Sequence, residues 1–87
     1  MASEERKYSK QILGKTIVSK SGKKFGEVGN IVFESRTGEI LNLTLKNPTH
    51  LADNLDLERD ESGNLLVPHG SVIAIGDFVV ISEEDIL

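Results

Sequence analysis

The stretch FGEVGNIVFESRTGEILNLTLK, residues 25–46, decides the fold class of this chain. Its first half is rich in β-branched and aromatic residues, and its second half alternates apolar and polar side chains. A period of two residues is typical of a strand with one buried face. We therefore expect two neighbouring strands joined by a turn at Gly38, with Leu41, Leu43 and Leu45 on the buried face.

Two glycines interrupt the first of these strands. Gly26 and Gly29 would destabilise a helix, whereas in a strand they fit a β-bulge or a sharp bend at the corner of a barrel. The second strand ends at Asn47-Pro48, because proline has no amide proton to donate to a neighbouring strand.

Further short apolar runs flank this pair, at residues 12–19, 65–67, 72–75 and 78–81. Ser21-Gly22 indicates a tight turn after the first of them. The most polar stretch is residues 49–63, and its centre, residues 50–57, fits either a helical turn or a short strand.

These patterns predict an all-β fold: a small barrel or rolled sheet of five or six short antiparallel strands, with at most a short helical turn. Closure into a barrel is favoured because a small open sheet leaves unpaired strand edges. We expect one domain over residues 12–82, an N-terminal tail at 1–11 and a C-terminal tail at 83–87.

The composition fits one small globular domain. The chain has 87 residues, of which 38% are hydrophobic and 28% charged, so it has enough apolar material for one core. No apolar run approaches the ~18 residues of a membrane-spanning helix, and no signal-peptide pattern follows the N-terminus. The lack of cysteine excludes disulfides, thiolate metal sites and cysteine nucleophiles. We therefore expect a cytoplasmic protein without membrane insertion.

The charges are unevenly distributed along the chain. Residues 1–46 contain nine Lys and Arg residues and five acidic residues. Residues 47–87 contain one Arg and nine acidic residues, and the net charge of the whole chain is −4. A net acidic protein is a poor general binder of nucleic acid, because that affinity comes largely from neutralised phosphates. We therefore do not expect nucleic acid as a partner, although a local basic face in the first half stays open.

Many positions, taken in order, resemble the PRC-barrel domain, which is named after the photosynthetic reaction centre. They are Leu13-Gly14-Lys15, Val18, Ser21-Gly22, Gly26, Val28, Asn30-Ile31, Phe33-Glu34, Thr37-Gly38, Ile40, Leu66-Val67-Pro68, Val72, Ile75-Gly76-Asp77 and Val79-Val80. The resemblance covers residues 12–82, and it departs from the family at Asn30 and Glu34, where Asp is frequent.

The resemblance implies a PRC-type β-barrel that binds other proteins and does not catalyse a reaction. A free-standing chain of this length is similar to small archaeal proteins linked to FtsZ-based cell division alongside the membrane anchor SepF. It implies an adaptor that reaches the division site through SepF or another division protein. The alternative is an RNA-processing or ribosome-assembly accessory resembling the PRC-barrel domain of RimM, with a basic face at Lys15, Lys20, Lys23 and Lys24.

The residues that could support catalysis or bind a metal form only a weak pattern. His50 and Asp53 are spaced to share one face of a helical turn, and His69 is the second histidine. Two histidines without a third strong ligand indicate a metal site only weakly. We therefore expect surface histidines and no catalytic residue, metal ion or cofactor.

A barrel of this size has little margin of stability, which favours a homo- or hetero-dimer with a PRC-barrel subunit. The expected interface positions are Ile40, Asn42, Val79, Ile81, Ile86 and Leu87. The first four are assigned to the outer faces of the third and last strands. Residues 72–81 contain only one ionised side chain, which suits the centre of a two-fold interface. The last two end an acidic tail that either docks in a partner's groove or is a frayed, solvated end.

Overall fold

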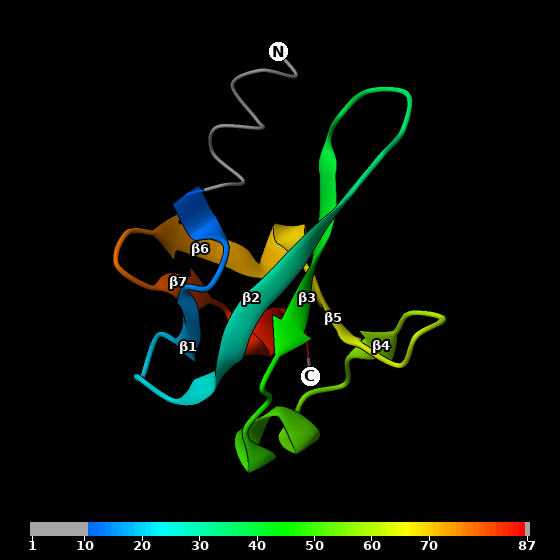
Figure 1. Ribbon diagram of the computed structural model, residues 1–87. Helices are drawn as coiled ribbons and strands as arrows, with labels where there is room; N and C mark the ends of the chain where they lie inside the picture. Colours follow the sequence, from blue (N-terminus) through cyan, green and yellow to red (C-terminus); the bar gives the residue numbers. More distant parts are fainter. Residues whose placement is uncertain (1–10, 87) are drawn as a thin grey trace.

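The computed structural model describes residues 11–86, which form one seven-stranded sheet (Figure 1). The strands are β1 (Thr16–Ser19), β2 (Lys24–Phe33), β3 (Ile40–Lys46), β4 (Glu58–Arg59), β5 (Leu65–Pro68), β6 (Val72–Ile75) and β7 (Val79–Ile81). The 3-10 helices are η1 (His50–Asn54), η2 (His69–Ser71) and η3 (Glu83–Asp85). The expected all-β fold is confirmed, with seven strands where five or six were expected.

The segment whose conformation was left open, residues 50–57, contains the helical turn η1 and no strand. The short strand β4 follows it and pairs with β5 through Glu58↔Leu66 and Arg59↔Leu65. Between β4 and β5 the chain makes a tight turn, closed by a 3.0 Å hydrogen bond from the Gly63 amide to the carbonyl oxygen of Asp60.

The sheet has the order β4-β5-β3-β2-β1-β7-β6, so β4 and β6 are its end strands. β1 and β7 are parallel, pairing through Ile17↔Val79 and Ser19↔Ile81, and the other pairs are antiparallel. The expectation of an entirely antiparallel sheet is therefore wrong. A parallel pair needs a long connection between its two strands, and the chain from β2 to β6 supplies it.

A β-bulge confirms the prediction for Gly29. Val28 pairs with Leu45 and Asn30 pairs with Thr44, so Gly29 is an extra residue in β2. A Cβ atom at this position would lie 3.1 Å from the Oγ1 atom of Thr44, which leaves little room for a side chain. The ten-residue strand β2 is strongly curved, and the sheet bends with it (Figure 1).

A second bulge reverses the expected orientation at the start of β3. The register shifts between Val32 and Phe33, which leaves Leu41 as the extra residue. The Leu41 side chain is 42% exposed, whereas that of Ile40 is 8% exposed. The expectation that Leu41 faces the core and Ile40 the outside is wrong, because alternation holds only for regularly paired strands. The other two leucines of this strand are buried as predicted.

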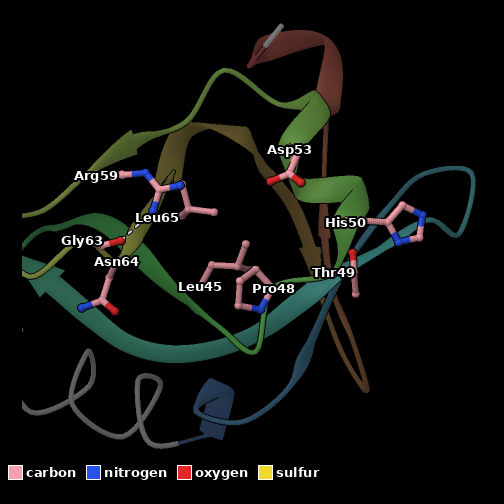
Figure 2. Close-up of a pocket in the computed structure, with 9 residues that line it drawn as sticks. All are labelled: Leu45, Pro48, Thr49, His50, Asp53, Arg59, Gly63, Asn64 and Leu65. Atoms are coloured by element: carbon pink, nitrogen blue, oxygen red, sulfur yellow. Dashed lines mark hydrogen bonds between the residues drawn. The ribbon is translucent and has the colours of Figure 1, made fainter.

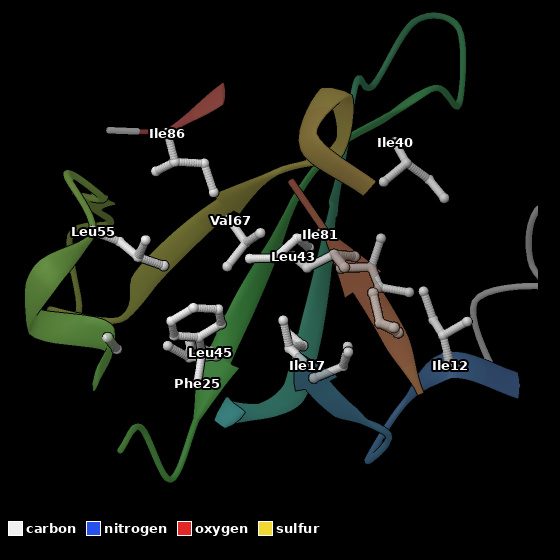
Figure 3. Close-up of a cluster of buried hydrophobic side chains, with 14 residues drawn as sticks. Ile12, Ile17, Phe25, Ile40, Leu43, Leu45, Leu55, Val67, Ile81 and Ile86 are labelled. Carbon is white, nitrogen blue, oxygen red and sulfur yellow. The ribbon is translucent and has the colours of Figure 1, made fainter. Parts of the chain in front are cut away.

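One hydrophobic core lies inside the curved sheet (Figure 3). Its buried members are Ile12, Ile17, Phe25, Val28, Ile31, Ile40, Leu43, Leu45, Ala52, Leu55, Val67, Val79, Ile81 and Ile86. They come from five of the seven strands, from η1 and Leu55 directly after it, and from the segments that flank the sheet in sequence. The end strands β4 and β6 contribute no buried member to the core, and their side chains are exposed or half-buried.

Candidate functional site

Four of the six expected interface side chains are buried within the subunit, three of them in β3 and β7. Val79 and Ile81 are 0% exposed and Ile40 is 8% exposed. β7 is last in sequence, but it lies between β1 and β6 in the sheet, and its alternate residues Val79 and Ile81 belong to the core. Their assignment to an outer face is therefore wrong.

The described part of the C-terminal segment also packs on the fold. Ile86 is 6% exposed and belongs to the core, toward Leu55 and Val67 in Figure 3. Its amide donates a 3.1 Å hydrogen bond to the carbonyl oxygen of Glu83. The expectation of an exposed Ile86 is wrong, because its side chain covers the end of the core. Leu87 lies outside the described residues.

Asn42 and Ile86 come together in a groove of about 340 Å³, which we call the acidic groove. Its other lining residues are Asp56, Glu58, Leu66 and Pro68. Strand pairing explains this placement, since Asn42 lies opposite Pro68 on β5, and Glu58 of β4 lies opposite Leu66. The groove thus combines two carboxylates with apolar side chains, and none of its six residues is basic.

Figure 2 shows a second hollow, of about 330 Å³, between η1 and the β4–β5 turn. His50 and Asp53 both line it, but their side chains point in different directions. Arg59 also lines it and donates a 2.9 Å hydrogen bond from Nη1 to the carbonyl oxygen of Gly63. His69 lies elsewhere, in η2. Within residues 11–86, no three His, Cys, Asp or Glu side chains gather in a way that would hold a metal ion.

The β4–β5 turn is organised by Asp60, a role that sequence reasoning missed. Its Oδ1 accepts hydrogen bonds from the amides of Ser62 and Asn64, each at 2.9 Å, and its Oδ2 accepts one from Nδ2 of Asn64 at 3.2 Å. The backbone hydrogen bond from Asn64, followed by the one from its side chain, lowers the pKa of Asp60 below its ordinary value. An Asp two residues before Ser-Gly-Asn is the signal that could have identified this turn.

Exposed apolar side chains lie on the hairpin formed by β6 and β7. Ile73 is 52% exposed and Phe78 is 48% exposed, and Ala74 between them is also exposed. β6 is an end strand, and its four residues, VIAI, carry no charge. We call Val72–Ile75 together with Phe78 the apolar edge. The low charge of this region was visible in the sequence, but the residues selected from it, Val79 and Ile81, face the core.

The segment that precedes β1 is attached beside this hairpin. The Nζ atom of Lys15 donates a hydrogen bond to the carbonyl oxygen of Gly76 in the β6–β7 turn. Leu13, which lies two residues earlier, is 45% exposed and adds a further apolar side chain to the accessible surface.

Comparison with known proteins identifies the family. The family model of the PRC-barrel domain matches residues 4–85. This chain belongs to the PRC-barrel family. The uncharacterized protein MJ1118 of Methanocaldococcus jannaschii is similar to it, with 30% identity over 82 residues that cover 94% of this chain and 88% of that protein. The resemblance noted in the sequence is therefore confirmed, and the chain carries a small protein-interaction module.

The two departures of this PRC-barrel from the frequent Asp of the family have local structural roles. The Oδ1 atom of Asn30 accepts a 2.8 Å hydrogen bond from the Ile31 amide, beside the first bulge. The Oε1 atom of Glu34 accepts a 3.1 Å hydrogen bond from the Arg36 amide, in the β2–β3 turn. Each side chain stabilises the backbone where a strand bends or ends. No helix in residues 11–86 of this PRC-barrel has the length and apolar character needed to cross a membrane.

Proposed function

We propose that this PRC-barrel is a non-enzymatic adaptor in FtsZ/SepF-based archaeal cell division. An adaptor has to hold two partners at once. The observation that supports the proposal is the position of two chemically different surfaces near opposite ends of one sheet. The apolar edge lies on β6, and the acidic groove lies beside β5 and β4. The similarity to an archaeal protein supports the archaeal setting.

The apolar edge is suited to binding another protein by hydrophobic burial. Ile73 and Phe78 are each about half exposed, so covering the remainder of either side chain contributes about 1 kcal/mol. An end strand also offers backbone hydrogen-bonding groups to an extended segment. Through this surface the adaptor forms a dimer with a PRC-barrel subunit.

The acidic groove is suited to a different partner. Asp56 and Glu58 match Lys or Arg side chains, and Leu66 and Pro68 offer contact to apolar ones. We assign to this groove a basic, partly apolar segment of a division protein, with SepF as the first candidate. In this proposal the protein is cytoplasmic and reaches the division site through that partner.

The alternative, an accessory of RNA processing or ribosome assembly, has weaker support. Lys20 and Lys24 are exposed at the β1–β2 turn. Between them in sequence, Lys23 has its Nζ atom 3.6 Å from a carboxylate oxygen of Glu83. An acidic neighbour weakens the positive field on which affinity for phosphates depends.

Affinity purification from an archaeal lysate tests the proposed function. The wild type is expected to recover SepF or another division protein, and Asp56→Lys/Glu58→Lys is expected to lose it. The matched control is Asp53→Lys/Glu61→Lys, which reverses two exposed acidic residues that do not line the groove. Recovery of ribosomal proteins without any division protein would contradict the proposal and favour the alternative.

A further inference from the structure

We infer that the occupant of the apolar edge is a second copy of this same chain, packed antiparallel about a two-fold axis that passes near the middle of β6. The inference rests on the proposed function, because it names the partner for one of the two surfaces of the adaptor. It commits to an identical subunit and to β6 as the strand that meets its own counterpart.

The first step is the geometry of β6. On its inner side it pairs with β7 through Val72↔Ile81, Ala74↔Val80 and Ile75↔Val79. No strand within residues 11–86 pairs with its other side, so the backbone groups on that side are open to another chain.

A bulge makes Ile73 the central side chain of this edge. Ile73 is the extra residue between the pairs of Val72 and Ala74, and it is 52% exposed. Bulges interrupt regular pairing at a sheet edge, so contact here combines packing of the Ile73 side chain with backbone hydrogen bonds from the neighbouring residues.

The lack of charge on β6 suits pairing with a second copy of itself. A two-fold axis brings the same residues of both subunits together, so an ionised group at the centre would face its own like charge. Val72–Ile75 carry no charge, so two copies of β6 meet without a contact between like charges. Asp77 lies beyond the end of β6, in the turn to β7, so it is outside the paired strands.

The opposite end of the sheet has the features of a protected edge. β4 contains only two residues, Glu58 and Arg59, and both are exposed and charged. Short, charged edge strands resist pairing with other chains, whereas an uncharged edge with exposed aliphatic side chains favours it. A second copy therefore binds at β6 and leaves the acidic groove beside β4 free for another partner.

The small size of the patch predicts a weak dimer. A stable interface buries about 800 Å² on each partner. Four strand residues and the Phe78 side chain cover less than that, so we expect a dissociation constant in the micromolar range and a dimer that dissociates on dilution.

Analytical ultracentrifugation of the full chain over a dilution series tests the inference. The wild type is expected to pass from dimer to monomer as it is diluted, whereas Ile73→Arg is expected to be monomeric at every concentration. The matched control is Leu41→Arg, which places the same charge on an apolar residue of similar exposure in β3 and should dimerise like the wild type. A monomeric wild type at every concentration, or an Ile73→Arg variant that dimerises as well as the wild type, would overturn the inference.

Two further measurements keep the outcome clear. If Ile73→Arg fails to fold by circular dichroism, Ala74→Asp serves in its place. Hydrogen exchange should show that the β6 amides exchange more slowly in concentrated than in dilute protein, and a dimer without this protection would place the interface elsewhere. A monomeric protein that still recovers division proteins would overturn the dimer and leave the proposed function standing. A β6 dimer that recovers no division protein would support the dimer and contradict the proposed function.

Discussion

Gly26 of β2 lies directly against Leu45 of β3, at a distance that leaves no room for a side chain. A Cβ atom at position 26 would lie 2.8 Å from Cδ1 of Leu45 and 3.0 Å from the carbonyl oxygen of Lys46. The φ angle of Gly26 is +153°, a conformation that L-amino acids rarely adopt. The lack of a side chain at Gly26 therefore allows β2 and β3, the two longest strands, to lie close together at this point.

Gly26→Ala should therefore destabilise the protein, because the added methyl group forces Leu45 or the β3 backbone to move. We expect the free energy of unfolding to fall by about 1–3 kcal/mol, measured by urea denaturation. Gly70→Ala is the matched control, since a Cβ there meets nothing within 4 Å, and it should change stability by less than about 0.5 kcal/mol. Equal effects of the two substitutions would contradict the packing described for β2 and β3.

Ile86→Ala should also destabilise the protein, because Ile86 is 6% exposed and belongs to the core. We expect the free energy of unfolding to fall by about 2 kcal/mol and the melting temperature to fall with it. This value is at the low end of the range for a buried isoleucine, because the structure near a chain end can relax around the substitution. Leu13→Ala, at a position 45% exposed, should cost less than about 1 kcal/mol. An unchanged melting temperature for Ile86→Ala would show that the C-terminal segment is a solvated tail after all.

Asp60 should make the stability of the protein depend on pH in acid. The amide of Asn64 lowers the pKa of this carboxyl below the value of 3.8 that it has in an unfolded chain. A lowered pKa means that the contribution to stability is present above the unfolded pKa and is lost as pH falls through the folded pKa. Wild type should exceed Asp60→Asn in stability at neutral pH, and the difference should shrink below about pH 4. A difference that is constant from neutral pH to pH 2 would contradict this role.

The two proposed interfaces should respond differently to salt. Binding of a basic partner at Asp56 and Glu58 should weaken as sodium chloride is added, because these carboxylates are exposed to screening. The dimer at the apolar edge should change little, since its residues in β6 carry no charge. Titrations of partner binding and of dimer dissociation at low and high salt measure both. A dimer that dissociates in salt would indicate that charge, and not apolar burial, holds it together.

Local sequence pattern was sufficient for six of the seven strands, and the two-residue β4 was missed. The uncharged run 72–75 coincides with β6, and the glycine between Val28 and Asn30 forms the bulge that its residue type predicts. Such features depend on residue preferences within a few positions, which a single sequence displays. The family resemblance rests on the same local positions.

The orientation of side chains could not be predicted in the same way. Ile40 faces inward because Leu41 forms a bulge. That bulge depends on how β3 aligns with β2, which the sequence of β3 alone does not show. Val79 and Ile81 are buried because β7 pairs with β1, which is far away in sequence. The acidic groove was missed for the same reason, since its lining comes from separate segments that only the sheet order brings together.

Fluorescence microscopy of a tagged copy in an archaeal cell that divides with FtsZ and SepF tests the adaptor role most directly. We expect a ring at mid-cell that coincides with FtsZ and disappears when SepF is depleted or when Asp56→Lys/Glu58→Lys replaces the wild type. A protein that stays dispersed through the cytoplasm at every stage of division, with SepF present, would contradict it.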